Sequence, residues 1–95
     1  MIISIIKLMI NIPEARSLKD KRKVVKSIKD RLIQKFKLSA AEVEDMNSIR
    51  NAVIAAAIVS NSKVHGETVL HKALTFVEDA FPGYLYETKI FSEYF

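Results

Sequence analysis

The side chains that most often carry metal or nucleophilic chemistry are scarce in this sequence. It has no cysteine and two histidines, His65 and His71, among 95 residues. Thiolate metal sites, disulfide bonds and a cysteine nucleophile are therefore excluded. Glu67 and His71 stand four residues apart, on one helical face, but two ligands without a third do not make a metal site. Because the two glycines are isolated and form no phosphate-binding loop, we expect neither a metal nor a cofactor.

Three acidic residues close together in the sequence raise the question of paired-carboxylate chemistry. A general acid and a general base must face the same site. Strand alternation would put Glu42 and Glu44 on the opposite side of the chain from Asp45. The same charges would also protect an exposed edge strand from pairing. No nucleophile–base pair is visible elsewhere, so we expect a protein that is not an enzyme and has no small-molecule substrate.

Positive charge is concentrated in one segment of the chain. The formal net charge is +4, yet residues 16–37 carry ten of the fifteen basic side chains and only two acidic ones. A row of lysines facing one way can contact a row of phosphates, although it can also be a merely solvated face. The predicted nucleic-acid contacts to phosphates are Arg16, Lys19, Lys23 and Lys26. The residues predicted to orient the N-terminal end of the helix are Lys21 and Arg22.

Lys21 differs from its basic neighbours, because helical periodicity places it inside the apolar arc. A lysine at such a position must extend its ammonium group to solvent or pair with an acid. In the topology predicted below, the turn after the second strand lies near the start of the first helix. Asp45 could therefore reach Lys21 or Arg22. An internal ion pair and a binding role both remain open for Lys21.

Hydrophobic periodicity predicts six elements of secondary structure. The segments with the β-branched or alternating pattern of strands are 2–12, 38–46, 51–60 and 84–93. Amphipathic helices are predicted from Leu18 to residue 35 or 36 and from the serines at 60–62 to about Phe81. Ser17 is the expected N-cap of the first helix, with Asp20 completing a short capping box.

This order of elements predicts an α+β fold, a ferredoxin-like βαββαβ sandwich that spans residues 1–95 as one domain. The four strands would form an antiparallel sheet, with both helices on one face. Because the central strands contain no aromatic side chains on which bases could stack, RNA would have to contact the helix side or an edge. No segment approaches the roughly 20 apolar residues of a spanning helix, so we expect no membrane association and a cytoplasmic location.

The opposite face of the predicted sheet has no helix to cover its apolar residues. An open apolar face suggests a partner, and the simplest partner is a second copy of the chain. The predicted homodimer interface residues are Ile3, Ile5 and Met9. Lys7 shares this face and would need a rim position or an acid such as Glu87 or Glu93. The alternative is that the C-terminal segment 91–95 folds over the face within one chain.

Four stretches of the sequence resemble one known family. They are Ile12-Pro13-Glu14-Ala15-Arg16-Ser17-Leu18-Lys19-Asp20-Lys21-Arg22, Ser39-Ala40-Ala41-Glu42-Val43-Glu44-Asp45, Val59-Ser60-Asn61 and Phe76-Val77-Glu78. This pattern resembles the YlxP-like family, a bacterial family of unknown function, over nearly the whole chain. The resemblance implies a ferredoxin-like fold. It implies no active site, since none is established for the family.

The genomic setting of that family bears on the partner. Members are often encoded near genes of translation initiation and ribosome maturation, which implies RNA or the ribosome. Relatives often have a tryptophan after the acidic strand, whereas residues 46–52 contain none here. We therefore predict a non-enzymatic RNA- or ribosome-associated binding module that uses a basic first helix. The alternative is a homo-oligomeric structural or regulatory assembly module with no nucleic-acid role.

Overall fold

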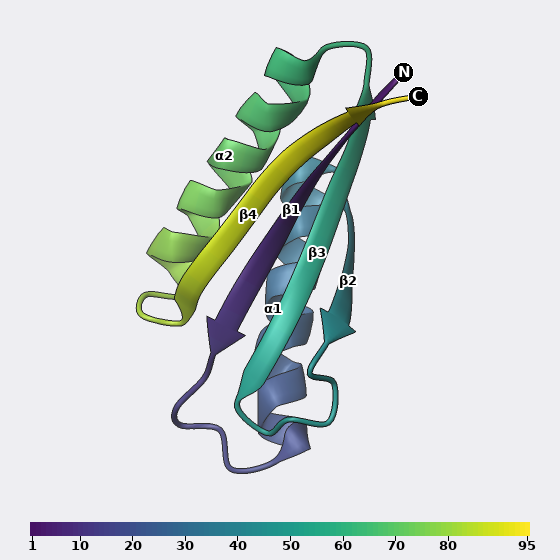
Figure 1. Cartoon of the computed structure of the whole chain (residues 1–95). Helices are drawn as coiled ribbons and strands as arrows, with labels where there is room; N and C mark the ends of the chain where they lie inside the picture. The colour runs from purple at the N-terminus through teal and green to yellow at the C-terminus, as the bar shows by residue number, and fades with distance from the viewer.

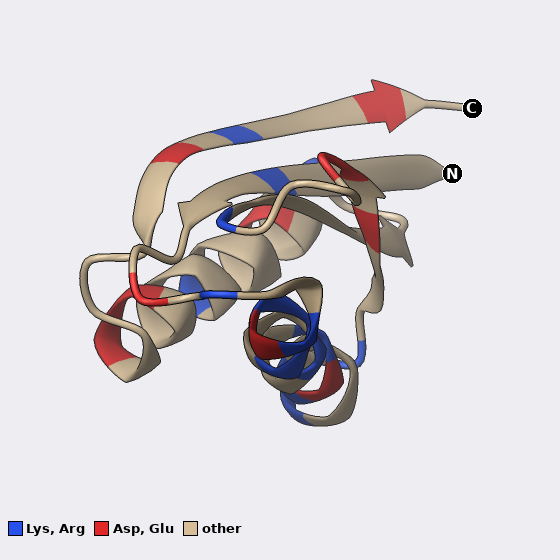
Figure 2. Cartoon of the chain, turned by 90° about the horizontal axis from the view of Figure 1, so that it is seen from below, with Lys and Arg blue, Asp and Glu red and all other residues tan.

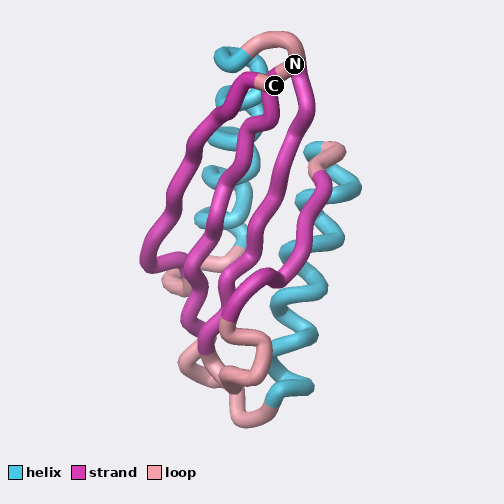
Figure 3. The backbone as a smooth tube through the Cα atoms, turned by 45° about the vertical axis from the view of Figure 1, so that its right-hand side comes forward, coloured by secondary structure: helices cyan, strands magenta, loops and turns pink.

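Six elements follow one another in the computed structural model, which describes residues 1–95 (Figure 1). They are β1 (Ile2–Asn11), α1 (Leu18–Phe36), β2 (Ser39–Glu44), β3 (Asn51–Ser60), α2 (Lys63–Ala80) and β4 (Leu85–Tyr94). The strands form one antiparallel sheet in the order β2–β3–β1–β4. Both helices lie on the same face of it (Figure 3). The predicted ferredoxin-like α+β fold is therefore confirmed.

The hydrophobic core lies between the sheet and the two helices. Successive side chains of a strand point to opposite faces, so the even-numbered residues of β1 meet the helices. Ile6, Leu8 and Ile10 are accordingly buried. The side chains that α1 and α2 contribute to the same cluster include Val25, Ile28, Leu32, Leu70, Ala73 and Val77.

Serine side chains begin both helices. The Oγ of Ser17 accepts a hydrogen bond from the backbone N–H of Asp20 at 3.1 Å, and the Oγ of Ser62 accepts one from His65 at 3.2 Å. The carboxylate of Asp20 accepts the backbone N–H of Arg16 at 3.0 Å, one residue before the position that a capping box requires. The cap prediction is thus confirmed for Ser17 and corrected for Asp20.

The two helices cover different halves of the sheet. α1 packs against β2 and β3, whereas α2 packs mainly against β1 and β4. α2 approaches β1 closely at Gly66, where an added Cβ would lie 2.6 Å from the Oγ of Ser4. Ser4 is fully buried there and shares a 2.7 Å hydrogen bond with the hydroxyl of Ser92. Neither helix is long and apolar enough to cross a bilayer.

The face of the sheet away from the helices is called the open face below. Ile3 and Ile5 are half-buried there, but Met9 is only 8% exposed, so its assignment to a dimer interface is corrected. The register explains this, because Met9 stands beside Val53 in a row that ends in a long glutamate side chain on either side. Lys7 pairs with Glu44 at 3.2 Å, not with Glu87 or Glu93.

The C-terminal residues lengthen the sheet. β4 continues to Tyr94, and the backbone N–H of Phe95 donates to the carbonyl of Met1 at 2.8 Å. The segment 91–95 therefore runs along the edge of the sheet, and the predicted alternative in which it folds over the open face is wrong. The first and last residues of the chain lie side by side (Figure 1).

Candidate nucleic-acid interface

A patch of positive charge covers the N-terminal half of α1 on its solvent side. It is called the basic face below, and its residues are Lys19, Arg22, Lys23 and Lys26. All four are exposed, and together they line a shallow depression of about 290 Å³. Their spacing of three and four residues places them next to one another on one side of a helix. Figure 2 shows the concentration of blue on α1, seen nearly end-on.

Most of the basic face is free of ion pairs. Lys26 forms an exposed pair with Asp30, 2.6 Å from its carboxylate, and the other three residues form none. Exposed pairs of this kind contribute little to stability. The positive charge of the face is therefore available to an external anion. Arg16, just before the helix, is also exposed.

The C-terminal half of α1 uses its cations differently. The guanidinium of Arg31 lies 5.2 Å from the ring centre of Phe81, and the ammonium of Lys35 lies 5.0 Å from that of Phe76. Both rings belong to α2 or the residue after it, so these contacts join the two helices through cation–π attraction. Among the ten basic residues of segment 16–37, those without an ion pair or a cation–π contact are therefore concentrated toward the N-terminal end of the segment.

A groove between α1 and β2 extends the basic face toward the sheet. It has a volume of about 420 Å³, and its lining residues are Arg22, Val25, Lys26, Lys29, Asp30 and Glu42. Three cations and two carboxylates thus face the same space. An anion in this groove would therefore meet three cations of α1 together with the carboxylates of Asp30 and Glu42.

Lys21 lies at the base of this arrangement and is fully buried. Its ammonium group donates to the backbone carbonyls of Asp45 at 2.8 Å and Asn51 at 3.1 Å, with that of Met46 at 3.4 Å. It also lies 3.0 Å from Oε2 of Glu42. A buried ammonium cannot touch a phosphate, so Lys21 makes no direct nucleic-acid contact. Of the two roles left open for it, the structure shows the internal one: Lys21 fixes the start of α1 against the turn between β2 and β3, as its predicted part in orienting this end of the helix requires.

The ion partner of Lys21 also differs from the expected one. Asp45 contributes its carbonyl, while the carboxylate comes from Glu42. Lysine has three N–H donors, and the three carbonyls occupy them. Oε2 of Glu42 is close enough to the ammonium group for a charge contact. Because the carbonyls take the N–H donors, this buried oxygen has no hydrogen-bond partner.

A bulge in β2 decides where its acidic side chains point. The register between β2 and β3 shifts between Glu42 and Glu44. Glu42 consequently faces α1 and Lys21, while Glu44 faces the open side and Lys7. The predicted arrangement, with Glu42 and Glu44 on one side and Asp45 on the other, is corrected. The two carboxylates do not meet at one site.

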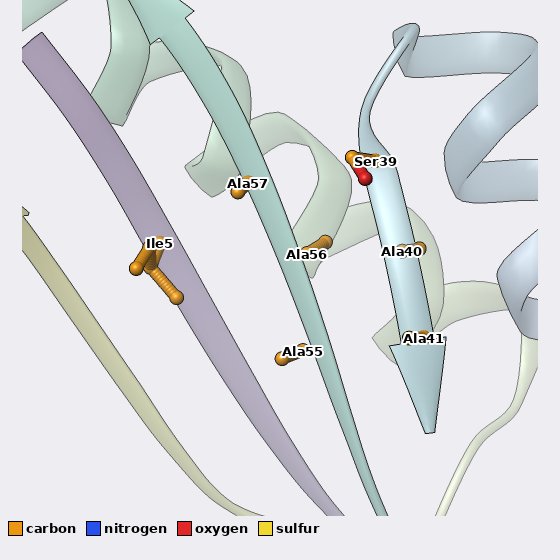
Figure 4. Close-up of a pocket in the computed structure, with 7 residues that line it drawn as sticks. All are labelled: Ile5, Ser39, Ala40, Ala41, Ala55, Ala56 and Ala57. Atoms are coloured by element: carbon orange, nitrogen blue, oxygen red, sulfur yellow. The ribbon is translucent and has the colours of Figure 1, made fainter. Parts of the chain in front are cut away.

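The two remaining surface depressions bring together few reactive or metal-binding side chains. One, of about 210 Å³, lies on the open face over β1, β3 and β2 (Figure 4). Its lining residues are Ile5, Ser39, Ala40, Ala41, Ala55, Ala56 and Ala57. The other lies along α2 beside the exposed His71. No three His, Asp or Glu side chains come together as metal ligands.

Comparison with known proteins supports the sequence resemblance. Residues 3–90 match the family described as “Protein of unknown function (DUF503)”. Over 69 residues the chain is 38% identical to “Uncharacterized protein YlxP” of Bacillus subtilis (strain 168), covering 73% of this chain and 74% of that protein. The predicted resemblance to the YlxP-like family is confirmed.

Proposed function

Since the chain belongs to the DUF503 family of proteins of unknown function, we propose that it is a non-enzymatic module that binds RNA or the ribosome through the basic face of α1. The partner is the phosphate backbone of a structured RNA. A cytoplasmic location goes with this proposal.

One observation carries the proposal: the basic face is exposed, positively charged and largely without internal partners. Lys21, Arg31 and Lys35 place their charged groups against carbonyls or aromatic rings of the same chain. The charged groups of Lys19, Arg22 and Lys23 make no such contact within the chain. Cations held on a rigid helix without counterions can replace the ions condensed on a nucleic acid.

The composition of the basic face favours phosphate contacts over contacts with bases. Proteins that bind unpaired bases commonly stack them on exposed aromatic side chains. The one aromatic residue of α1, Phe36, is half-buried and packs edge-on against Phe76, with ring centres 5.7 Å apart. Binding should therefore depend strongly on salt and weakly on sequence, since phosphates carry no sequence information.

The test is a titration of a labelled RNA hairpin at two salt concentrations. If four phosphates are contacted, affinity should fall about 100-fold between roughly 50 mM and 200 mM salt. The variant Lys19→Glu/Lys23→Glu should bind at least about tenfold more weakly than the unchanged protein at low salt. Absence of binding by the unchanged protein at low salt would contradict the proposal.

A matched control separates a local contact from a general effect of charge. Lys63→Glu/Lys72→Glu alters net charge by the same amount on exposed residues of α2. This control should retain most of the affinity. An equal loss in both variants would show that the basic face has no special role.

Self-association is a second candidate function, as a homo-oligomeric assembly module. The observation that favours it is a group of apolar side chains on the open face, where exposed Val59 and Phe91 flank half-buried Ile3 and Ile5. Ile5→Asp should dissociate a dimer that uses this face while leaving each copy folded. Light scattering at micromolar concentration measures the outcome, and a monomer in the unchanged protein would contradict this candidate.

A further inference from the structure

The two edges of the sheet are built differently. β2, at one edge, has six residues, contains a bulge and has α1 packed against it. β4, at the other edge, has ten residues and pairs only with β1. Figure 3 shows β4 along the margin of the sheet with no element beside it. A long unpaired edge is a template for another strand.

Large aromatic side chains on and next to β4 are exposed to solvent. Phe91 is 46% exposed, Tyr94 72% and Phe95 69%. Natural proteins protect a free edge with charges, and β4 does carry three on its open-face side, at Glu87, Lys89 and Glu93. Their signs alternate along the strand. This alternation allows an antiparallel partner strand to neutralise them.

Lys89 and Glu93 have no ion partner within the chain. The register places Lys89 directly opposite Lys7, an arrangement that is unfavourable for like charges. Lys7 is compensated by Glu44 at 3.2 Å, and no acid compensates Lys89 in the same way. Glu93 stands opposite the apolar Ile3. Both charges are free for a partner outside the chain.

The hydrogen bonds at the end of β4 show which backbone groups face outward. Phe95 donates to and accepts from Met1, so the odd-numbered residues of β4 bond to β1. In an antiparallel ladder the direction alternates with each residue. The N–H and C=O groups of the even-numbered residues therefore point away from the sheet; they are those of Thr88, Ile90, Ser92 and Tyr94.

We propose that two copies of this chain pair β4 against β4, antiparallel, about a two-fold axis at Phe91. This proposal rests on the second candidate function, self-association, but it places the interface at the outer edge of β4 instead of on the open face; it is independent of RNA binding by α1. In this register Lys89 of each copy faces Glu93 of the other, and the two Phe91 rings meet at the axis. The outward-facing residues pair with one another and form about eight backbone hydrogen bonds.

Other registers leave the charges unpaired or use less of the strand. An axis at Lys89 would oppose the two Lys89 side chains, and an axis at Ile90 would oppose Glu87 to Glu93. An axis at Thr88 pairs opposite charges, but it runs the ladder past the irregularity at the start of β4, where the pairing with β1 shifts. The register centred on Phe91 alone combines opposite charges with regular strand.

The helices permit this pairing and place the basic faces apart. α2 packs against β1 as well as β4, on one face of the sheet, so it leaves the outer edge of β4 free. α1 lies under β2 and β3, at the far side of each sheet. The paired sheets would therefore carry one basic face at each end, and loss of pairing would leave each face intact.

Charge exchange at the interface is the main test. Lys89→Glu and Glu93→Lys each put like charges opposite each other twice, so each should raise the dissociation constant at least about tenfold. The double variant Lys89→Glu/Glu93→Lys should recover the affinity. An equimolar mixture of the two single variants should form a heterodimer, because every facing pair is again one lysine and one glutamate. Sedimentation velocity measures the association of the two single variants, the double variant and the mixture. Lys72→Glu on α2 is the control that should stay dimeric.

Amide hydrogen exchange tests the register itself. On dimerisation, the amides of Ile90 and Ser92 should become protected, while that of Phe91 is protected in the monomer already. The proposal is overturned if the unchanged protein is monomeric at micromolar concentration. It is also overturned if a dimer forms with these two amides still exchanging rapidly, or if both single variants dimerise as the unchanged protein does; the last two results would indicate the open face instead. RNA affinity of a monomeric single variant reports separately on the proposed function.

Discussion

The two helices lie on the same sheet but are fixed to it by different means. α1 is held at its start by a buried ammonium group, since Lys21 reaches three carbonyls and Glu42 near the turn between β2 and β3. α2 is held by close packing, where Gly66 lets its backbone approach Ser4. The difference teaches that a charged residue in a basic helix can be structural while its neighbours remain free. Each way of holding a helix can be broken by one substitution.

Loss of the buried cation should have the largest effect. Lys21→Met leaves Glu42 as a charge without a partner and three carbonyls without a donor, so the free energy of unfolding should fall by about 3–5 kcal/mol. Urea denaturation measures this. Lys19→Met, two residues away and exposed, is the control and should change stability by less than about 0.5 kcal/mol. Equal stability of the two variants would show that Lys21 does not fix the helix.

A double substitution sharpens this result. Lys21→Met/Glu42→Met removes both charges, and replacing a buried ion pair by apolar side chains is often far less harmful than removing one partner. The double variant should therefore be more stable than Lys21→Met alone. Additive losses would indicate that the ion contact between the two residues is unimportant.

Crowding at the start of α2 should have the next largest effect. In Gly66→Ala, the new methyl group meets the hydroxyl of Ser4, which its bond to Ser92 holds in place. Overpacking of this kind commonly costs about 1–3 kcal/mol, and the better helix propensity of alanine offsets about 1 kcal/mol of that. We expect thermal unfolding to show a net loss of stability of up to about 2 kcal/mol. A stabilised Gly66→Ala would mean that the contact relaxes without cost.

The features of the two helices and of β1 that depend on nearby residues were predicted well from the sequence. Ser17, the alternation of Ile6, Leu8 and Ile10, and the two apolar stripes all depend on neighbours in sequence, so periodicity reveals them. Periodicity also showed that Lys21 lies in an apolar arc. It could not identify Glu42 as the partner, because that depends on the bulge in β2, which turns Glu42 toward α1.

Non-local arrangement also explains the other corrections. Met9 follows the strand alternation correctly, but its burial depends on Val53 from another strand. The path of the C-terminal residues depends on their pairing with Met1, 94 positions earlier. The exposed basic face could be predicted because surface lysines on a helix require no distant partner. Its ligand could not be, because phosphates leave no further mark in the sequence.

Removal of the serine N-cap should destabilise the protein by a similar amount in either helix. Ser17→Ala and Ser62→Ala each remove the acceptor for one free N–H group, so each should lower the free energy of unfolding by about 1 kcal/mol. Chemical denaturation of both variants in parallel measures the comparison. A much smaller loss for Ser17→Ala would mean that the carboxylate of Asp20 takes over as the cap.

The exposed pair on α1 should matter least for stability. Lys26→Gln breaks the contact with Asp30, and the loss should be only about 0.3–0.5 kcal/mol. RNA affinity at low salt should nevertheless fall several-fold, because one cation of the basic face is lost. Paired measurements of denaturation and RNA binding separate the two effects. A variant with reduced stability and unchanged affinity would place Lys26 with the structural cations.

The contact between Met1 and Phe95 has a consequence for the topology of the backbone. With the amide of Phe95 bonded to the carbonyl of Met1, a short flexible linker could join the ends and leave the ladder between β1 and β4 undisturbed. New termini could be opened at the exposed turn around Gly83, where a Cβ would meet no other atom within 4 Å. Such a circular permutant would begin at β4 and end at α2, with β4 still at the edge of the sheet and connected directly to β1 as a hairpin.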